Sequence, residues 1–342
     1  SYWGMTLSSS NMISNFAMID VGGKRLTHRR AVAAGKIFLG SRAFAKVKDK
    51  TLDKGDCFPM AEIAGIIGAK QCAVVLPMCH PLPLDQVTVS FELDHAEKAV
   101  RAFCEAVAYA RTGVEMEALA GANSALMCIW DLCKGTDPVL RISDVELLTK
   151  TGGKSGVWIN SAAFIPQWVF DRLPNQKPLA DRKVAVIVMS DRATEGIYED
   201  ESGKYLVERI ENEGGEVCDY RLIPDDETEI DLAISEISGT DDPHVIICTG
   251  GTGPGPRDVT PNILKKHLNP ELPGFGEWLR SESAAYTKTA WLSRMGGGLV
   301  GRALLIALPG SLQAVKECFD IFMEGLPKAI IMIEKQGRKG RI

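Results

Sequence analysis

Hydrophobic residues in the second half of the chain form short continuous runs separated by helical patterns. The runs occupy residues 184–189, 244–248 and 303–308, and each leads into a loop of small or polar residues. Strands that are apolar on both faces and alternate with helices are typical of a parallel sheet covered on both sides. We therefore predict an α/β three-layer, doubly wound domain over residues 183–334, in which Ser311 caps a helix.

The first half follows a different pattern, in which short strands are mixed with long apolar helices, and it predicts an α+β domain over residues 18–156. Its longest helical stretch runs from Met116 to Lys134 and is apolar nearly all round, so it should be buried. The stretch still carries Glu117 near its start and Asp131 at its end. Because burying a charge is costly unless the charge is paired or used, these residues are candidates for chemistry.

The charged residues of this stretch cannot all share one small site within a straight helix. Asp131 and Lys134 lie on one helical face, whereas Glu117 is separated from Asp131 by roughly 21 Å along the axis at ~1.5 Å per residue. The pattern therefore predicts either an extended ligand or a site assembled between protomers.

The segment between the two halves, residues 157–182, is unusually aromatic for a linker. It contains Trp158, Phe164, Trp168 and Phe170 beside three prolines, whereas a flexible linker would be polar or rich in glycine and serine. We predict that these aromatic side chains dock on a domain or on a partner subunit. The ends of the chain are expected to be a loose leader, residues 1–17, and a short basic tail, residues 335–342.

Composition agrees with two globular domains. The 342 residues correspond to two domains at ~150 residues each, and 45% hydrophobic with 24% charged residues is ordinary for a folded protein. The formal net charge is -5, and neither half has the basic excess of a nucleic-acid binder. No apolar run approaches the ~20 residues of a membrane helix, and the first residues lack the order of a signal peptide. We therefore expect a cytoplasmic protein with neither nucleic-acid nor membrane partners.

The nine cysteines favour reduced thiols in the core over a disulfide framework, since their number is odd and no export signal is evident. None forms a Cys-x-x-Cys pair. The closest pairs are Cys72 with Cys79 and Cys128 with Cys133, and a structural zinc site is not favoured.

Candidate chemistry in the first half comes from His80, which is flanked by prolines, and from lysines in polar loops. Histidine is well suited to proton transfer near neutral pH, although a lone histidine is more often a hydrogen-bonded loop residue. Lys150 and Lys154 lie on a glycine-rich loop. That loop is not a P-loop, because Leu148 occupies the position of the first glycine.

Seven blocks occur in order over this half: Met18-Ile19-Asp20-Val21, Thr27-His28-Arg29-Arg30-Ala31, Lys54-Gly55-Asp56, Met78-Cys79-His80-Pro81-Leu82, Thr112-Gly113-Val114-Glu115-Met116-Glu117-Ala118-Leu119, Asp131-Leu132-Cys133-Lys134 and Lys150-Thr151-Gly152-Gly153-Lys154-Ser155-Gly156. Together they resemble the MoaC family, the cyclic pyranopterin monophosphate synthases. The family's usual segment before Met18 is missing, since the chain has Asn11-Met12-Ile13-Ser14-Asn15 there.

The resemblance implies a ferredoxin-like α+β subunit in a hexamer built of dimers, with its site at a subunit interface and no tightly bound cofactor. It implies that a cyclic dihydro-GTP intermediate is rearranged to cyclic pyranopterin monophosphate with release of pyrophosphate. The catalytic residues would be Lys54, Asp131 and Lys134. Substrate contacts would fall on Arg29, Met78, Cys79, His80, Glu115, Met116, Glu117, Lys150 and Lys154.

In the second half, the strand ending at Cys248 leads into a glycine-rich loop, residues 249–261. Glycines at the carboxyl end of a parallel strand allow a close approach to an anion, and Thr260 with Pro261 would begin the next helix as its cap and first residue. The loop does not fit Gly-x-Gly-x-x-Gly, because Pro256 takes the last glycine position, and an ordinary tight turn stays an alternative.

Acidic residues follow the neighbouring strands. Asp191 and Asp225 each come just after a strand, and loops at the same edge of a doubly wound sheet converge on a crevice. Carboxylates beside a phosphate loop, Asp258 included, indicate a bound divalent cation, although exposed aspartates are also common.

Seven blocks occur in order over this half: Ser190-Asp191-Arg192-Ala193, Pro224-Asp225, Gly250-Gly251-Thr252-Gly253, Arg257-Asp258-Val259-Thr260-Pro261, Pro273-Gly274-Phe275-Gly276-Glu277, Leu292-Ser293-Arg294 and Leu308-Pro309-Gly310-Ser311. Together they resemble the MogA/MoaB family of molybdopterin-binding proteins. The resemblance implies that molybdopterin is adenylylated with ATP and Mg²⁺. Asp225 and Asp258 would be catalytic and hold the metal, while Ser190, Asp191, Gly250, Gly251, Thr252, Gly253 and Ser311 would contact substrate. A pterin-binding or assembly scaffold without turnover is the alternative for this domain.

Overall fold

The computed structural model describes residues 16–153, 156–240 and 242–339, and the chain divides into two compact units, Ser1–Leu173 and Pro174–Ile342. Lys154 lies outside the described residues, as do most of the expected leader and the last residues of the expected tail. Within the described part, no helix combines the length and the apolar character needed to cross a membrane.

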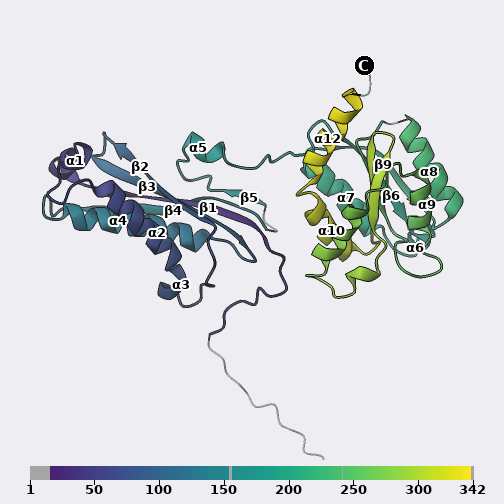
Figure 1. Ribbon diagram of the computed structural model, residues 1–342, viewed down its shortest axis with the longest axis horizontal. Helices are drawn as coiled ribbons and strands as arrows, with labels where there is room; N and C mark the ends of the chain where they lie inside the picture. Colours follow the sequence, from purple (N-terminus) through teal and green to yellow (C-terminus); the bar gives the residue numbers. More distant parts are fainter. Residues whose placement is uncertain (1–15, 154–155, 241, 340–342) are drawn as a thin grey trace, which may run out of the picture. The chain divides into compact units, whose positions relative to one another are not determined.

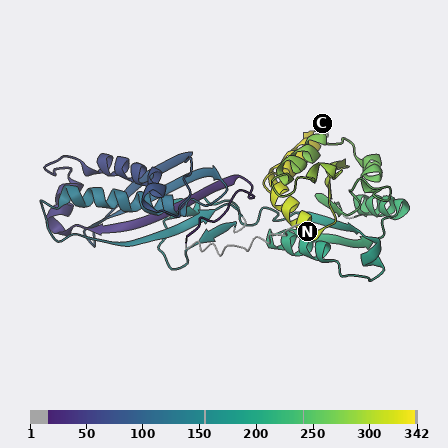
Figure 2. The same ribbon diagram turned by 90° about the horizontal axis from the view of Figure 1, so that it is seen from below.

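The first unit is built on a five-stranded antiparallel sheet in the order β2-β3-β1-β4-β5. The order and connections of its first four strands are those of a ferredoxin-like fold, which confirms the expected fold class. Helices α2 and α4 lie side by side over one face of the sheet (Figures 1 and 2). The elements are β1 (Thr27–Phe38), α1 (Gly40–Lys48), α2 (Cys57–Lys70), α3 (Cys72–Val75), β2 (Gln86–Asp94), β3 (Ala99–Ala110), α4 (Glu115–Cys133), β4 (Arg141–Thr151), β5 (Val157–Ile159) and α5 (Gln167–Phe170).

Helix α4 begins and ends one residue before the predicted stretch. Small residues let it approach α2 closely: a Cβ at Gly121 would lie 3.1 Å from the backbone oxygen of Gly65 and 2.4 Å from Cys104 Sγ on β3. The prediction that the helix is buried is correct for one face only: eight of its 19 residues are buried, including Glu117 at 3% exposed, whereas Met116 and Met127 on the other face are exposed. The expectation of burial is wrong at the end of the stretch, where the Asp131 and Lys134 side chains are 55% and 61% exposed.

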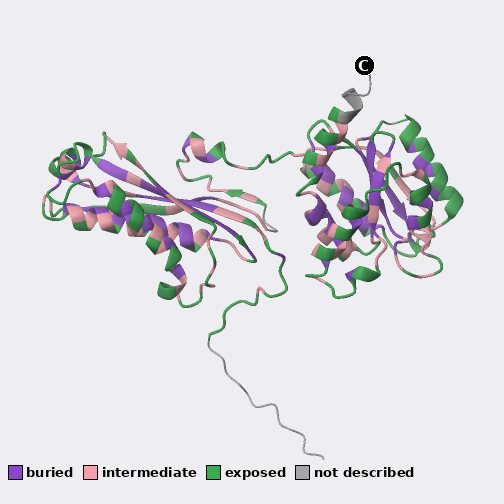
Figure 3. Ribbon diagram, in the orientation of Figure 1, coloured by how far each residue is buried: buried purple, intermediate pink, exposed green. Residues whose placement is uncertain are grey.

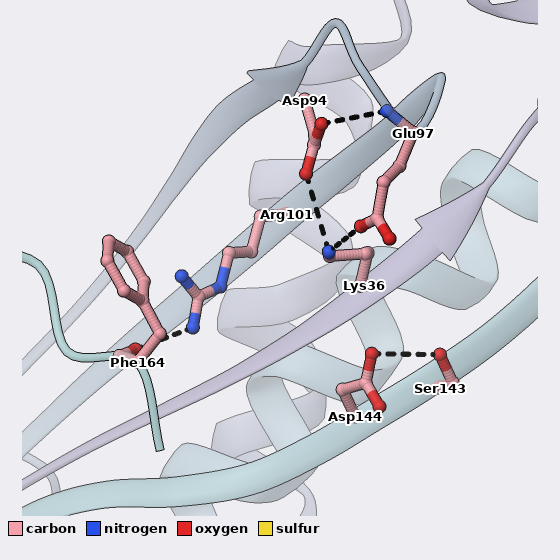
Figure 4. A network of polar contacts seen from close by, with 7 residues as sticks. All are labelled: Lys36, Asp94, Glu97, Arg101, Ser143, Asp144 and Phe164. Carbon is pink, nitrogen blue, oxygen red and sulfur yellow. Dashed lines mark hydrogen bonds and ion pairs between the residues drawn. The ribbon is translucent and has the colours of Figure 1, made fainter.

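The aromatic segment docks on the sheet face opposite the helices. Trp168 packs edge-on against Phe103 of β3, with ring centroids 5.5 Å apart, and α5 adds Val169 to the same buried cluster. Arg101 donates a hydrogen bond of 2.7 Å to the Phe164 carbonyl and lies over the Phe164 ring (Figure 4). Docking is therefore confirmed for part of the segment, although the side chains of Trp158, Phe164 and Phe170 stay exposed.

A buried carboxylate fastens the far end of this segment. Glu105 on β3 is 3% exposed and pairs with Arg172, which follows α5, and with Arg30 of β1 at 3.1 Å. Arg30 also donates to the Arg172 carbonyl at 3.2 Å. The segment up to Arg172 is thus held to the first unit by both apolar packing and charge.

The second unit is an α/β domain whose sheet has the order β7-β6-β8-β10-β9. Strands β7, β6, β8 and β10 are parallel, and β9 is an antiparallel edge strand that the apolar runs did not predict. Buried clusters cover both faces of the sheet, as expected, and its central strands are buried (Figure 3). The elements are β6 (Lys183–Met189), α6 (Asp191–Thr194), α7 (Glu201–Asn212), β7 (Glu216–Ile223), α8 (Glu227–Thr240), β8 (Val245–Thr249), α9 (Thr260–His267), α10 (Pro273–Ser283), η1 (Ala290–Leu292), β9 (Gly296–Val300), β10 (Ala303–Leu308), α11 (Leu312–Phe322) and α12 (Leu326–Lys339).

Two predicted helix starts have different outcomes. Ser311 caps α11 as expected, with its hydroxyl accepting from the Ala314 backbone N–H. The start of α9 is one residue earlier than predicted, because Val259 takes the cap position and Thr260 is the first helical residue. The Thr260 hydroxyl therefore does not cap the helix, and it lies buried without a hydrogen-bond partner among the described residues.

The buried ion pair of Glu105 makes a stability prediction. Glu105→Gln keeps the shape of the side chain but removes the charge shared with the two arginines, so we expect the unfolding free energy of the first unit to fall by about 2 kcal/mol. Urea denaturation followed by circular dichroism measures the change. Glu97→Gln, which removes an exposed partner of Lys36, is the control and should leave the transition unchanged. Equal effects of the two substitutions would contradict the assignment.

Candidate active sites

At the end of α4, one carboxylate holds two ammonium groups. Asp131 Oδ1 lies 2.6 Å from Lys134 Nζ, and Asp131 Oδ2 lies 3.5 Å from Lys54 Nζ, which belongs to the loop before α2. All three side chains are more than half exposed. The hydrogen bond from Lys134 lowers the pKa of Asp131, and the positive charges of both lysines lower it further. The group therefore offers a solvent-facing surface with a net positive charge.

At the other end of α4, a second group surrounds Glu115. Lys150 Nζ of β4 lies 3.0 Å from the Glu115 carboxylate. Burial lowers the pKa of Arg29 on β1, and the negative charge of Glu115 partly offsets this lowering. Gly153 has φ +69°, which favours glycine, and a Cβ there would lie 1.9 Å from an Arg29 guanidinium nitrogen, so the arginine side chain would have to move. The glycine-rich loop thus lies directly against the arginine.

A third group, beside the second, contains sulfur and a buried carboxylate. Cys79 Sγ lies 3.6 Å from Glu117 Oε1, and burial raises the pKa of Glu117. His80 Nε2 lies 2.9 Å from the Ile19 carbonyl; since a carbonyl only accepts, the Nε2 atom must carry the proton. Met78 and Met116, also expected to contact substrate, are nearly half exposed.

The first unit therefore presents its expected site residues in two separate places. One group lies near the start of α4 and contains Arg29, Cys79, His80, Glu115, Glu117 and Lys150. The other lies at the end of α4 and contains Lys54, Asp131 and Lys134. Along the helix axis, Glu117 and Asp131 are separated by about 21 Å at the ordinary rise per residue. A single small ligand could not reach both ends within one copy of the chain.

In the second unit, a cavity of about 570 Å³ opens at the carboxyl ends of the parallel strands. The chain order reverses between β6 and β8, and ligands of doubly wound sheets bind at such a switch point. Its lining includes seven of the expected site residues, namely Ser190, Asp191, Asp225, Gly250, Gly251, Asp258 and Ser311.

Glycine is required where the loop after β8 meets its neighbours. Gly250 has φ +112°, and a Cβ there would lie 2.1 Å from the Met189 carbonyl at the end of β6. At Gly251, with φ +60°, a Cβ would lie 2.3 Å from Thr260 Oγ1 and 2.8 Å from Asp225 Oδ1. The absent side chain leaves a space bordered by two buried oxygen atoms that have no hydrogen-bond partner among the described residues.

The carboxylates of Asp191, Asp225 and Asp258 line the same cavity. The Asp225 backbone N–H donates to Asp191 Oδ1 at 2.9 Å, and Asp258 Oδ2 accepts from the Gly255 N–H at 2.8 Å. Burial raises the pKa of Asp225 first, and the charges of Asp191 and Asp258 raise it further. A cation would relieve this repulsion and give Asp225 Oδ1 the partner it lacks.

Two arginines of the lining, Arg192 and Arg257, were not among the predicted contacts, although both lie inside the recognised motifs. Their charges suit phosphate. Conversely, Thr252 and Gly253 are not among the lining residues: the Thr252 hydroxyl lies 3.2 Å from Ser293 Oγ, and the Gly253 carbonyl accepts from Arg294 Nε at 3.0 Å.

Arg294 holds the whole loop in place. Besides Gly253, its guanidinium donates to the Asp258 carbonyl and, at 3.1 Å, to Asn262 Oδ1, while its backbone N–H donates to the Thr252 carbonyl at 2.8 Å. No local pattern marks it, because its partners lie more than 30 residues away. Only its place in the resemblance singled it out.

Comparison with known proteins agrees with this two-part organisation. The MoaC family matches residues 18–153, and the family described as "Probable molybdopterin binding domain" matches residues 185–328. The units thus define a fusion of a MoaC-family domain with a molybdopterin-binding domain of the MogA/MoaB type.

Relatives with both domains cover nearly the whole chain. The "Molybdenum cofactor biosynthesis bifunctional protein" of Synechococcus elongatus is 36% identical over 320 residues, which are 93% of this chain and 97% of the relative. The protein of the same name from Chlorobaculum tepidum is 33% identical over 320 residues, which are 94% of this chain and 95% of the relative. The crystal structure of MoaB from Thermus thermophilus is 30% identical, covers 44% of this chain and 96% of its own, and has a TM-score of 0.43. The chain belongs to the family of molybdenum cofactor biosynthesis bifunctional proteins.

The charge group at the end of α4 makes a prediction about titration. Lys134→Met removes the hydrogen bond and the nearer positive charge, so we expect the pKa of Asp131 to rise toward its ordinary value. Lys54→Met should raise it less, because Lys54 lies farther away. Carbon-13 NMR titration of the aspartate carboxyl groups measures both shifts, with Lys46→Met, which faces Asp53, as the control. An unchanged Asp131 midpoint in Lys134→Met would rule out the pairing.

Proposed function

We propose that the first unit converts the cyclic dihydro-GTP intermediate into cyclic pyranopterin monophosphate and releases pyrophosphate. The observation that carries this proposal is the group formed by Lys54, Asp131 and Lys134, in which two ammonium groups share one exposed carboxylate. Ring opening and closure need several proton transfers, and pyrophosphate departure needs fixed positive charge. A lysine side chain can transfer protons or supply positive charge. Asp131 would accept a proton and return it during the ring opening and closure.

The residues near the start of α4 would bind the rest of the substrate. Arg29 and Lys150 supply positive charge for phosphate, and Lys154 on the same loop would add to it. Glu117, whose pKa is raised by burial, would share hydrogen bonds with pterin nitrogens. Cys79, His80, Glu115, Met78 and Met116 would complete the contacts.

Because these two groups lie at opposite ends of α4, we propose that the complete site forms between protomers. One copy would provide Lys54, Asp131 and Lys134, and its neighbour would provide the residues around Glu117. A homo-oligomer, which we expect to be a hexamer built of dimers, satisfies this requirement. Its substrates are small molecules of the cytoplasm, where we expect the protein to act.

For the second unit we propose adenylylation of molybdopterin with ATP and Mg²⁺. The residues fit the ion, since Asp225 Oδ1 is buried without a partner among the described residues, beside Asp191 and Asp258. When bound, Mg²⁺ would neutralise phosphate charge. The phosphates would be held and oriented by the backbone of Gly250 and Gly251, by the Ser190 and Ser311 hydroxyls, and by the lining arginines. Asp258 would keep the loop closed.

Turnover by the first unit tests the first proposal. With the purified full chain and the cyclic GTP-derived intermediate, Lys54→Ala, Lys134→Ala and Asp131→Asn should each lower the rate of product formation by about 10²–10⁴-fold, as expected for lost proton transfer. Lys46→Ala, an exposed paired lysine outside the site, should not. Normal product formation by the three variants, with the oligomer intact by light scattering, would refute the assignment.

Mixing two inactive variants tests assembly between protomers. Co-expressed Lys134→Ala and Glu117→Gln chains should regain activity, because about a quarter of randomly assembled sites receive both intact ends. If each site belonged to one chain, the mixture would stay inactive.

The second proposal predicts loss of pyrophosphate release in Asp225→Asn and Asp258→Asn with molybdopterin and MgATP. Asp242→Asn is the matched control, because Asp242 is an exposed aspartate that is not among the residues lining the cavity. The measurement also separates an enzyme from a scaffold: an enzyme yields adenylylated product that the variants lose, whereas a scaffold binds molybdopterin and releases no pyrophosphate even as wild type.

A further inference from the structure

Three metal-binding side chains meet beside the start of α4. Cys72 begins α3, Cys79 follows in the loop after it, and Glu117 belongs to the first turn of α4. The turn after α3 brings the two cysteines together, with the Leu76 N–H bonded to the Cys72 carbonyl and the Cys79 N–H bonded to the Leu76 carbonyl. One sulfur or oxygen atom from each of the three side chains lies within 4.8 Å of the others.

The spacing of these atoms matches tetrahedral coordination. Two Zn–S bonds of about 2.3 Å at the tetrahedral angle place their sulfurs about 3.8 Å apart, and a Zn–O bond of about 2.1 Å places sulfur and oxygen about 3.6 Å apart. The distances are 3.8 Å between Cys72 Sγ and Cys79 Sγ, and 3.6 Å between Cys79 Sγ and Glu117 Oε1. The side chains need only a small closing movement to surround an ion.

The surroundings of these three side chains favour a bound cation, because each side chain is acidic and, within the described part of the chain, none has a positive charge beside it. Burial and, to a lesser degree, the negative charge of Glu117 together raise the pKa of Cys72 to about 12, and the same two causes raise the pKa of Cys79. Independently of titration, Glu117 Oε2 is buried and has no hydrogen-bond partner among the described residues, on a side chain that is 3% exposed. The cluster is thus short of both positive charge and donors.

We propose that Cys72, Cys79 and Glu117 form a binding site for one thiophilic divalent cation of the zinc class. Thiolate sulfur favours such ions over Mg²⁺, and three protein ligands leave the fourth position open to water or another small ligand. Each thiol loses its proton to solvent as its metal–sulfur bond forms, with no change of oxidation state. The inference goes beyond the proposed function, in which Cys72 has no part.

Occupation of this site would engage two of the proposed pterin contacts, Cys79 and Glu117. Metal binding and substrate binding would then compete for the same side chains.

The test is a Co²⁺ titration of the full-length protein, kept reduced by a phosphine and freed of metal beforehand, with no substrate present. The wild type should bind one equivalent through this site, with sulfur-to-cobalt charge-transfer absorption, and Zn²⁺ should displace it. Cys72→Ser should lose that absorption and bind at least about 100-fold more weakly, since even outer-shell changes cost 10–100-fold. Glu117→Gln should weaken binding while the thiolate absorption persists at high Co²⁺.

Cys128→Ser is the matched control, because Cys128 is a half-buried cysteine of the same unit outside the cluster, and it should bind like the wild type. Thermal unfolding adds a second readout, in which Zn²⁺ stabilises the wild type but not Cys72→Ser. Absorption that is equal in wild type and Cys72→Ser, or absent from the reduced wild type, would overturn the proposal. Product formation measured with a chelator present tests the proposed function separately.

Discussion

A carboxylate removed from water needs a donor or a positive charge, and this requirement governs the most informative parts of both units. Glu105 satisfies it inside the protein, where two arginines surround it and fasten the aromatic segment to the sheet. Glu117 and Asp225 each keep one buried oxygen that, among the described residues, has neither a hydrogen bond nor the ion pair that Glu105 Oε1 makes with Arg30. A buried carboxylate therefore stabilises the fold at Glu105, whereas at Glu117 and Asp225 one of its oxygens lacks a donor or an ion-pair partner within the described part of the chain. Both of these positions lie where ligands are expected.

The fold followed from the sequence wherever a local pattern determined it. The three apolar runs became β6, β8 and β10, and the long apolar stretch became α4 with its ends moved by one residue. Strand β9 escaped prediction because Gly296, Gly297 and Gly298 carry no hydrophobic alternation; its place is set by pairing with β10. The predicted cap of α9 is wrong by one residue because Thr260 is itself the first helical residue and its buried hydroxyl does not cap the helix.

The candidate sites were predictable to the extent that topology alone brings residues together. Loops at the carboxyl ends of parallel strands had to converge, so Asp191, Asp225 and Gly251 could be grouped from sequence. Likewise, the length of α4 alone separated Glu117 from Asp131. What the sequence could not provide were contacts across distant segments, such as Arg294 with the glycine loop or Cys72 with Glu117, since neither spacing resembles a known motif.

The contacts of Arg294 have a consequence for ligand affinity. A glycine-rich loop left to itself samples many conformations, and a ligand that orders it loses part of its binding free energy to that ordering. Here one side chain from near β9 fixes the loop before any ligand binds, so the entropy is lost during folding instead. A relative that kept every glycine but lacked this arginine would have the same recognition surface and a weaker grip on its ligand.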